Sequence, residues 1–384
     1  MRPDHHPRLT ADPLGITSQE FVLHARSAGV SDSHALAMYR ALYRNADPGR
    51  LPFTPPTITK VLREQSPEGE VVKFLTQVPA PDSGPEALRA APLEVESVLI
   101  PMIGSLGVST YTLCVSSQVG CAMGCGFCET AQMGLIRSLS AAEIVAQWYA
   151  ARHMIGIAPK NIVFMGMGEP MHNYDNVIHA VAILKDHNGP RVPISNITIS
   201  TVGNVDGIRK MAEQIKQDGW HRLNIALSLN APNNAVRSQI MPINKTWDMH
   251  ALQEVLLAWP KFAGNKICIE YVLIPGVNDQ PQHLAEIAAF MEPFKETDKH
   301  GRPTSKPRAL INLIPYNPRR NSPWPAPTEE QVEAFLSGLI GAGVFAKRRR
   351  TKGRAMMGAC GQLGAAHIRN RRLVQPTISG TGGA

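Results

Sequence analysis

The chain has 384 residues, of which 43% are hydrophobic, and a formal net charge of +8. This length can bury a large core, which excludes a small module stapled by disulfides. No apolar run reaches the roughly 20 residues of a membrane span, and the first residues lack the apolar stretch of a secretory signal. We therefore expect a cytoplasmic protein with no membrane partner, whose six cysteines bind metal or react.

The first 110 residues predict two small parts. Helical periodicity predicts two short helices within residues 18–45, with Ser18 as the N-cap, and we interpret residues 1–50 as a helical module. Residues 51–110 are rich in proline and predict a linker joined to a β extension. Strand patterns in this part cover residues 71–78 and 93–100.

Strand and helix patterns alternate over residues 111–345. The predicted strands cover residues 112–117, 161–165, 196–200, 222–228, 266–274 and 309–314. The predicted helices cover residues 141–153, 174–185, 206–216, 249–259, 284–294 and 329–340. Six β-α repeats predict an α/β fold, a partial (β/α)6 barrel, whose functional groups collect where the strands end.

Three cysteines follow the first barrel strand with the spacing CxxxCxxC: Cys121, Cys125 and Cys128. Three thiolates can hold three irons of a 4Fe-4S cluster, and the lack of a fourth cysteine nearby would leave one iron open for a substrate. A zinc knuckle and three buried apolar cysteines are the alternatives. Structural zinc needs four ligands, and no Cys or His lies between Cys128 and His153, so we favour the cluster.

Polar residues follow other strands at the same expected rim. Gly168 and Glu169 lie in a Gly-Met-Gly-Glu-Pro turn, where the carboxylate could accept hydrogen bonds from a ligand's amino group. Ser200, Ser228 and Asn317 follow later strands and could bind a carboxylate, ribose or adenine. Taken singly, each is more often a turn or cap residue, but a shared rim favours binding.

Residues 346–384 form a basic C-terminal segment. Nine Lys and Arg residues and no Asp or Glu lie between Ala334 and Ala384, which indicates either a solvated face or a nucleic-acid surface. Cys360 lies in a glycine-rich turn here. It is either small and buried, or an exposed nucleophile whose pKa is lowered by nearby arginines. Cys114 and Cys268 lie in strands and, considered singly, are core residues.

Five ordered motifs, at residues 114–128, 165–170, 241–244, 311–317 and 359–363, together resemble the RlmN/Cfr family of radical S-adenosylmethionine (SAM) RNA methylases. The likeness runs from about Leu93 to Leu363, and the helical start is compatible with the family's RNA-binding module. It implies a radical SAM barrel with a 4Fe-4S cluster on the three spaced cysteines. It also implies an RNA substrate, flavodoxin or ferredoxin as electron donor, and a monomer. The implied SAM contacts are Gly168, Glu169, Ser200, Ser228, Leu229, Asn230 and Asn317.

The resemblance further implies a ping-pong mechanism that consumes two SAM molecules per turnover. One SAM methylates Cys360, and a second is cleaved to a 5′-deoxyadenosyl radical that takes a hydrogen from the S-methyl group. The resulting radical adds to an adenine carbon. Glu96 would then remove the ring proton, and Cys114 would resolve the protein–RNA thioether by forming a disulfide with Cys360. Such a route suits an electrophilic amidine carbon, at which ordinary nucleophilic methyl transfer fails.

The expected product is an adenosine methylated at carbon 2, in 23S ribosomal RNA and also in transfer RNA. The chain departs from the family pattern at Val202, where the family has Ser, at Asn230, where it has His, and after Gly134, where its usual Phe is missing. These departures leave the RNA target and the methylated carbon open. The alternatives are the same chemistry at carbon 8 and a non-catalytic iron-sulfur RNA-binding protein. Retention of Cys114, Glu96 and Cys360 counts against a non-catalytic protein.

Overall fold

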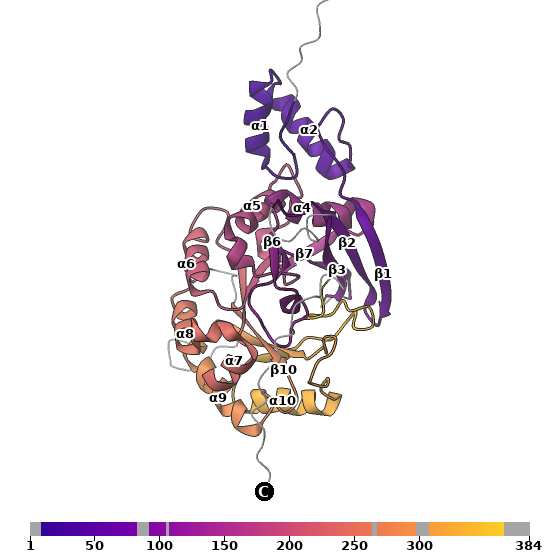
Figure 1. Cartoon of the computed structure of the whole chain (residues 1–384). Coiled ribbons are helices and arrows are strands. Elements are labelled where there is room, and N and C mark those ends of the chain that lie inside the picture. The colour runs from indigo at the N-terminus through magenta and orange to yellow at the C-terminus, as the bar shows by residue number, and fades with distance from the viewer. Residues whose placement is uncertain (1–8, 83–91, 105–106, 263–266, 297–306, 365–384) are drawn as a thin grey trace, which may run out of the picture.

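One open sheet organises the molecule. The structure, a computed structural model, describes residues 9–82, 92–104, 107–262, 267–296 and 307–364. Ten strands form the sheet in the order β1-β2-β3-β4-β7-β8-β9-β10-β11-β12, and helices pack around it (Figure 1). Because β1 and β12 are its two edges, the sheet does not close. The predicted α/β class and the partial barrel are confirmed.

The helical module lies at one end of the molecule, as Figure 1 shows. It consists of α1 (Ser18–Ser27) and α2 (Asp32–Asn45), as predicted. The N-cap of α1 is Thr17, not Ser18, because Thr17 and Glu20 form a capping box. Ser18 instead donates its backbone N–H to the carboxylate of Asp186 at 2.6 Å. This bond joins the module to the barrel.

The β extension is an antiparallel meander of β1 (Ile58–Ser66), β2 (Gly69–Val78) and β3 (Leu93–Ile103). The sequence did not predict β1, because this edge strand is polar and none of its side chains is buried. β3 pairs antiparallel with β4, so the extension continues the barrel sheet. Residues on β2 and β3 can therefore contribute to a site at the barrel.

The barrel strands run parallel to their neighbours from β4 to β12. The six predicted strands are confirmed, and β12 is a seventh that was not predicted. The strands are β4 (Ser109–Cys114), β7 (Pro159–Phe164), β8 (Ile197–Thr201), β9 (Asn224–Ser228), β10 (Ile267–Leu273), β11 (Ala309–Pro315) and β12 (Ala346–Arg348). Their apolar side chains are buried on both faces, as expected for a covered parallel sheet.

The six predicted barrel helices are present, and a short seventh, α7, follows β9. The helices are α4 (Ala141–Tyr149), α5 (Tyr174–Lys185), α6 (Val205–Gln214), α7 (Asn234–Ile240), α8 (Met249–Leu257), α9 (Pro281–Met291) and α10 (Glu329–Gly341). Side-chain caps at Ser140, Asn204, Asp248 and Thr328 begin four of them. Helix α4 continues into a π-helical turn, Ala150–Met154. Among the described residues, no helix combines the length and apolar character that crossing a bilayer requires.

Candidate active site

The three spaced cysteines lie in a loop held from several sides. A two-stranded ribbon, β5 (Gln118–Gly120) and β6 (Leu135–Ser138), frames the loop. Gly120 has a φ of 77°, and a Cβ there would lie 1.8 Å from the carbonyl oxygen of Gly134, so only glycine fits. The backbone N–H of Gly126 donates to Ile240, and the carbonyl of Gly126 accepts from the buried guanidinium of Arg319 at 2.7 Å. These bonds fix the loop without using a thiol.

The thiols fit a cluster better than a single metal ion. Burial raises the pKa of Cys121 to about 12 and also raises the pKa of Cys125 and Cys128, so a metal would have to displace their protons. In the described part of the chain, no three Cys, His, Asp or Glu residues lie close enough to hold one ion. A 4Fe-4S cluster needs only three thiolates when each binds a different iron. A closed structural zinc site would need a fourth protein ligand.

The three thiols face a pocket of about 900 Å³, counting the space open to solvent. Most of the predicted SAM-binding residues line the same pocket, although they come from the ends of four different strands, β7, β8, β9 and β11. They are Gly168, Glu169, Ser200, Ser228, Asn230 and Asn317. Leu229 does not line it, because its side chain is fully buried in the core.

Glu169 joins two of the strand-end loops. Its Oε2 accepts the backbone N–H of Val202 at 2.9 Å, and its Oε1 accepts that of Met171 at 3.1 Å. Only 1% of the residue is exposed, and this burial raises the pKa of Glu169 to about 7 despite the two donors. The carboxyl group therefore changes charge near neutral pH.

Asn230 has a structural role at the position where the family has histidine. Its φ of 58° is left-handed, a conformation that asparagine tolerates better than most residues. The Oδ1 of Asn230 accepts the N–H of Val272 at 3.0 Å, and its carbonyl accepts from Asn278 at 2.9 Å. The side chain thus fixes the β9 loop and also lines the pocket.

Arg237, which the sequence reasoning missed, holds the loops after β8 and β9. The residue is fully buried, and its guanidinium donates to the carbonyl oxygens of Val202 and Leu229 and to the amide oxygen of Asn244. Burial lowers the pKa of Arg237 to about 10. The sequence signal that could have identified Arg237 was its place four residues before the Met-Pro-Ile-Asn motif.

Cys360 and Cys114 share a second, smaller pocket beside the first. Cys360 lines both pockets, and Cys114, at the end of β4, lines only the second. Cys360 is not the exposed thiol of lowered pKa that was one expectation: it is half-buried, and burial raises its pKa more than Arg349 lowers it. Burial likewise raises the pKa of Cys114 to about 12.

The disulfide between Cys114 and Cys360 that the resemblance implies is not present. All six cysteines of the chain are free thiols. That expectation is therefore wrong for the protein as it stands. The physical reason is that burial raises the pKa of both Cys114 and Cys360 and so favours the protonated thiols.

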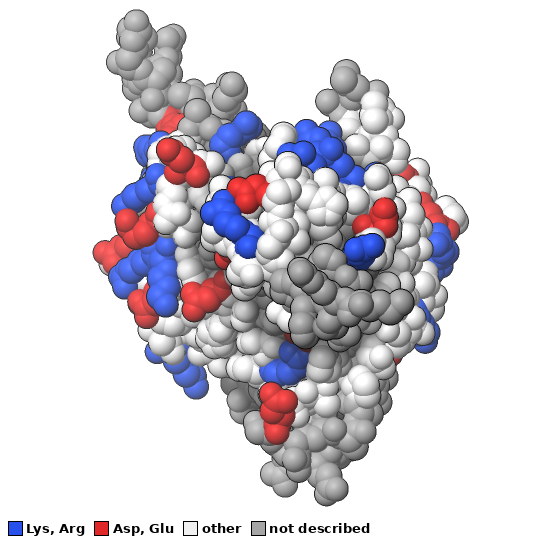
Figure 2. Space-filling model, turned by 90° about the horizontal axis from the view of Figure 1, so that it is seen from above, with Lys and Arg blue, Asp and Glu red and all other residues white. Residues whose placement is uncertain are grey.

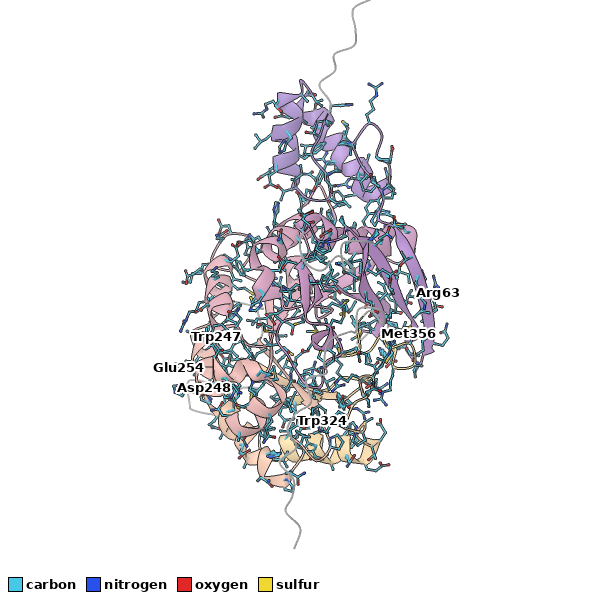
Figure 3. All side chains as sticks on the ribbon, viewed as in Figure 1. Arg63, Trp247, Asp248, Glu254, Trp324 and Met356 are labelled. Carbon is cyan, nitrogen blue, oxygen red and sulfur yellow. The ribbon has the colours of Figure 1, made fainter. Side chains whose placement is uncertain are left out.

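Glu96 lies outside both pockets, on β3, where it is buried. Its carboxylate is 2.9 Å from the ammonium of Lys73 and accepts the N–H of Gly364 at 2.9 Å. It lines an open groove between β1, β2 and the segment before Cys360. Arg63 and Met356, both labelled in Figure 3, lie on this side of the molecule and line the groove.

The basic segment is less exposed than expected. Arg348 pairs with Glu329 and Glu333 on α10, Arg349 lies 3.6 Å from Glu270, and Arg350 lies 3.2 Å from Glu68. Arg350 nevertheless remains exposed, as does Lys347. Arg369, Arg371 and Arg372 lie outside the described residues. Seen from the end that carries α1 and α2, acidic and basic side chains are interspersed (Figure 2).

Comparisons with known proteins agree with this geometry. The profile of the Radical SAM superfamily matches residues 115–288. The probable dual-specificity RNA methyltransferase RlmN 1 of Protochlamydia amoebophila is 39% identical over 280 residues, which cover 73% of this chain and 72% of that protein. The dual-specificity RNA methyltransferase RlmN of Lawsonia intracellularis is 40% identical over 280 residues, which cover 71% and 73%.

A solved structure is also similar over nearly the whole chain. The radical SAM methyltransferase from Sphaerobacter thermophilus superposes with a TM-score of 0.75 at 31% identity, covering 91% of this chain and 98% of that one. The resemblance found in the sequence is therefore confirmed. This chain belongs to the RlmN family of radical SAM RNA methyltransferases.

Proposed function

We propose that the protein methylates carbon 2 of an adenosine in 23S ribosomal RNA and also acts on transfer RNA. The observation that carries the proposal is one pocket onto which three cluster-spaced thiols, Glu169 and Cys360 converge. The relatives at 39% and 40% identity, which are named dual-specificity RNA methyltransferases, support RNA as the substrate. RNA and an electron donor such as flavodoxin or ferredoxin are the partners of this reaction, which a monomer carries out.

The pocket divides into a cluster side and a SAM side. Cys121, Cys125 and Cys128 would hold a 4Fe-4S cluster. Glu169, Ser200 and the other strand-end residues would orient SAM beside it. When bound, these cofactors supply a carbon radical from SAM and the electron that generates it. Buried Glu169 can accept the ammonium group of SAM when it is ionised.

Cys360 is proposed as the methyl carrier, consuming one of the two SAM molecules of each turnover. Its position supports this role, since it lines both the large pocket and the pocket that contains Cys114. The nearby guanidinium of Arg349 favours the thiolate, which is the form that accepts a methyl group. Cys114 lines the same small pocket as Cys360, which supports its proposed role in freeing the product from Cys360.

Glu96 is proposed as the base that removes the adenine proton. Its carboxylate lies in a groove whose rim carries three exposed cations, Lys60, Arg63 and Arg320. Cations at the rim can contact RNA phosphates while a single base reaches inward. The groove wall includes Met356 and Met357, just before Cys360, so carrier and base belong to adjoining surfaces.

Mass spectrometry of nucleosides is the direct test. RNA from cells with and without the gene should differ by 2-methyladenosine in ribosomal and transfer RNA. A gain of 8-methyladenosine instead would favour the alternative at carbon 8. Anaerobically purified protein should be brown and should cleave SAM under reductant. Brown protein that binds RNA but never cleaves SAM would establish the non-catalytic alternative.

A further inference from the structure

Lys73 and Glu96 form a buried ion pair beside the groove. The two residues lie on the same face of neighbouring strands β2 and β3, where Leu75 is the direct partner of Glu96. The ammonium and the carboxylate are 2.9 Å apart, and only 5% and 6% of their side chains are exposed. Removing one partner of a buried ion pair leaves the other charge uncompensated.

The segment that carries Cys360 is bonded to this pair on both sides. The ammonium of Lys73 donates to the carbonyl oxygen of Met357 at 2.9 Å, three residues before Cys360. The Oε2 of Glu96 accepts the N–H of Gly364 at 2.9 Å, four residues after it. The Cys360 turn is therefore held at both ends by one ion pair on the β extension.

Other bonds hold the same segment to the cluster loop. The carbonyl of Gly361 accepts the N–H of Glu129 at 2.7 Å, and the carbonyl of Leu363 accepts the hydroxyl of Thr130 at 2.6 Å. The segment should thus remain docked when Lys73 is replaced. Lys73 supplies a positive charge between Glu96 and the Cys360 turn.

We propose that Lys73 is a positioning residue for RNA methylation: its ammonium holds the Glu96 carboxylate in place relative to the turn that carries Cys360. This inference rests on the proposed role of Glu96 as the base. It predicts that Lys73 is needed when the adenine proton is removed, and not when Cys360 receives its methyl group. The two half-reactions separate these roles.

The test uses the full-length holoenzyme with Lys73→Met, Lys73→Arg and Glu96→Gln. In Lys73→Met, methylation of Cys360, read from the mass of its peptide, should stay within about twofold of wild type, whereas RNA methylation should fall about a hundredfold. Deuterium at carbon 2 of the target adenosine should slow the Met variant more than wild type, because proton removal becomes limiting. Lys73→Arg keeps the charge and should restore most of the rate.

The isotope effect and the rescue by Lys73→Arg are readouts that a merely structural role would not move. The other charged side chains that line the groove are common to all these proteins: Lys60, Arg63, Glu64, Glu94 and Arg320. Lys216→Met, which removes an exposed lysine paired with Glu213 on the far helix α6, is the matched control and should change neither the isotope effect nor the rate.

The outcomes distinguish this inference from the proposed function. If Lys73→Met methylates RNA like wild type while Glu96→Gln is inactive, Lys73 has no positioning role but the base assignment stands. If Glu96→Gln itself keeps the wild-type rate, the base assignment fails. If Lys73→Met loses methylation of Cys360 as well, the separation of roles is overturned. Should the Met variant not fold, Lys73→Gln, which is neutral but polar, replaces it with the same expectations.

Discussion

The guanidinium of Arg349 lies 3.6 Å from the carboxylate of Glu270, beside the pocket that Cys114 and Cys360 share. Arg349 follows β12 directly, and its backbone N–H donates to Leu313 on β11 at 2.8 Å. β12 thus places the guanidinium of Arg349 beside Cys114 and Cys360. The raised pKa of Arg349, to which Cys360 contributes first and Glu270 next, indicates that its charge persists there.

Replacing Arg349 with Met should make Cys360 a poorer nucleophile. The thiol's pKa, already raised by burial, would rise further once the guanidinium is gone, because Arg349 lowers it. Alkylation of Cys360 by iodoacetamide at pH 8 should therefore slow by roughly tenfold or more, measured on its peptide in cofactor-free protein. Arg349→Lys keeps a positive charge and serves as control. Equal alkylation rates in all three proteins would show that Arg349 does not act on this thiol.

Replacing any one of Cys121, Cys125 or Cys128 with Ala should remove the cluster. Two thiolates cannot hold a 4Fe-4S cluster stably, so the brown absorbance and the formation of 5′-deoxyadenosine should both be lost. Cys268→Ala is the matched control, since this half-buried cysteine of β10 does not line the pocket. A single variant of the three spaced cysteines that stays brown and cleaves SAM would refute the assignment.

The cofactor-free protein should lose stability as the pH rises, because of Glu169. Burial raises the pKa of Glu169 from 4.5 to about 7, so the folded state holds its proton more tightly than the unfolded state does. Its contribution to the free energy of unfolding is therefore fully present below about pH 4.5 and lost by about pH 7. The loss amounts to at most roughly 3 kcal/mol.

Urea unfolding of wild type and Glu169→Gln between pH 5 and 8 measures this effect. The difference in unfolding free energy between the two proteins should fall as the pH rises, since other titrating groups are common to both. A difference that does not change with pH would mean that Glu169 is ionised throughout. Its hydrogen bonds from Val202 and Met171 would then outweigh its burial.

Neutralising Lys60 and Arg320 at the groove rim should weaken RNA binding. Both are exposed, and each lost phosphate contact should reduce the slope of log affinity against log salt by about one. Arg209→Ala, which removes an exposed arginine on α6, should leave the slope unchanged. An unchanged slope in the double variant would place the RNA elsewhere. Arg348 and Arg349 are unsuitable for this test because their internal ion pairs would be broken.

The local parts of the site could be predicted from the sequence. The cysteine spacing and the Gly-Met-Gly-Glu turn are short patterns, and parallel strands bring their ends to one rim. Ser200 and Asn317 thus reached the predicted pocket although their strands are not adjacent in the sheet. That strand ends share one rim did not reveal that the side chain of Leu229 is buried in the core. The rule predicts where a loop lies and not where each of its side chains points.

Contacts between distant residues could not be predicted. The charge pattern of residues 346–384 suggested a free basic face, but Arg348 is paired with two carboxylates on α10. Sequence spacing does not show such partners. The pairing of Lys73 with Glu96 depends on the register of β2 against β3, and a single-residue slip would turn the two side chains to opposite faces.

The proposed roles of Cys360 and Cys114 predict opposite results when each thiol is removed. The two residues line one small pocket. Cys360→Ala deletes the methyl carrier, and no RNA should become attached to the protein. Cys114→Ala keeps the carrier but lacks the thiol that frees the product.

The Cys114→Ala variant should therefore accumulate a covalent protein–RNA adduct. On a denaturing gel, the adduct should migrate as protein that carries RNA and should resist reductant, because a thioether is not a disulfide. RNase digestion should leave a nucleotide mass on the Cys360 peptide, and the double variant of Cys114 and Cys360 should form no adduct. If Cys114→Ala methylates RNA at the normal rate, Cys114 is a buried core residue of β4 and its proposed role in product release is wrong.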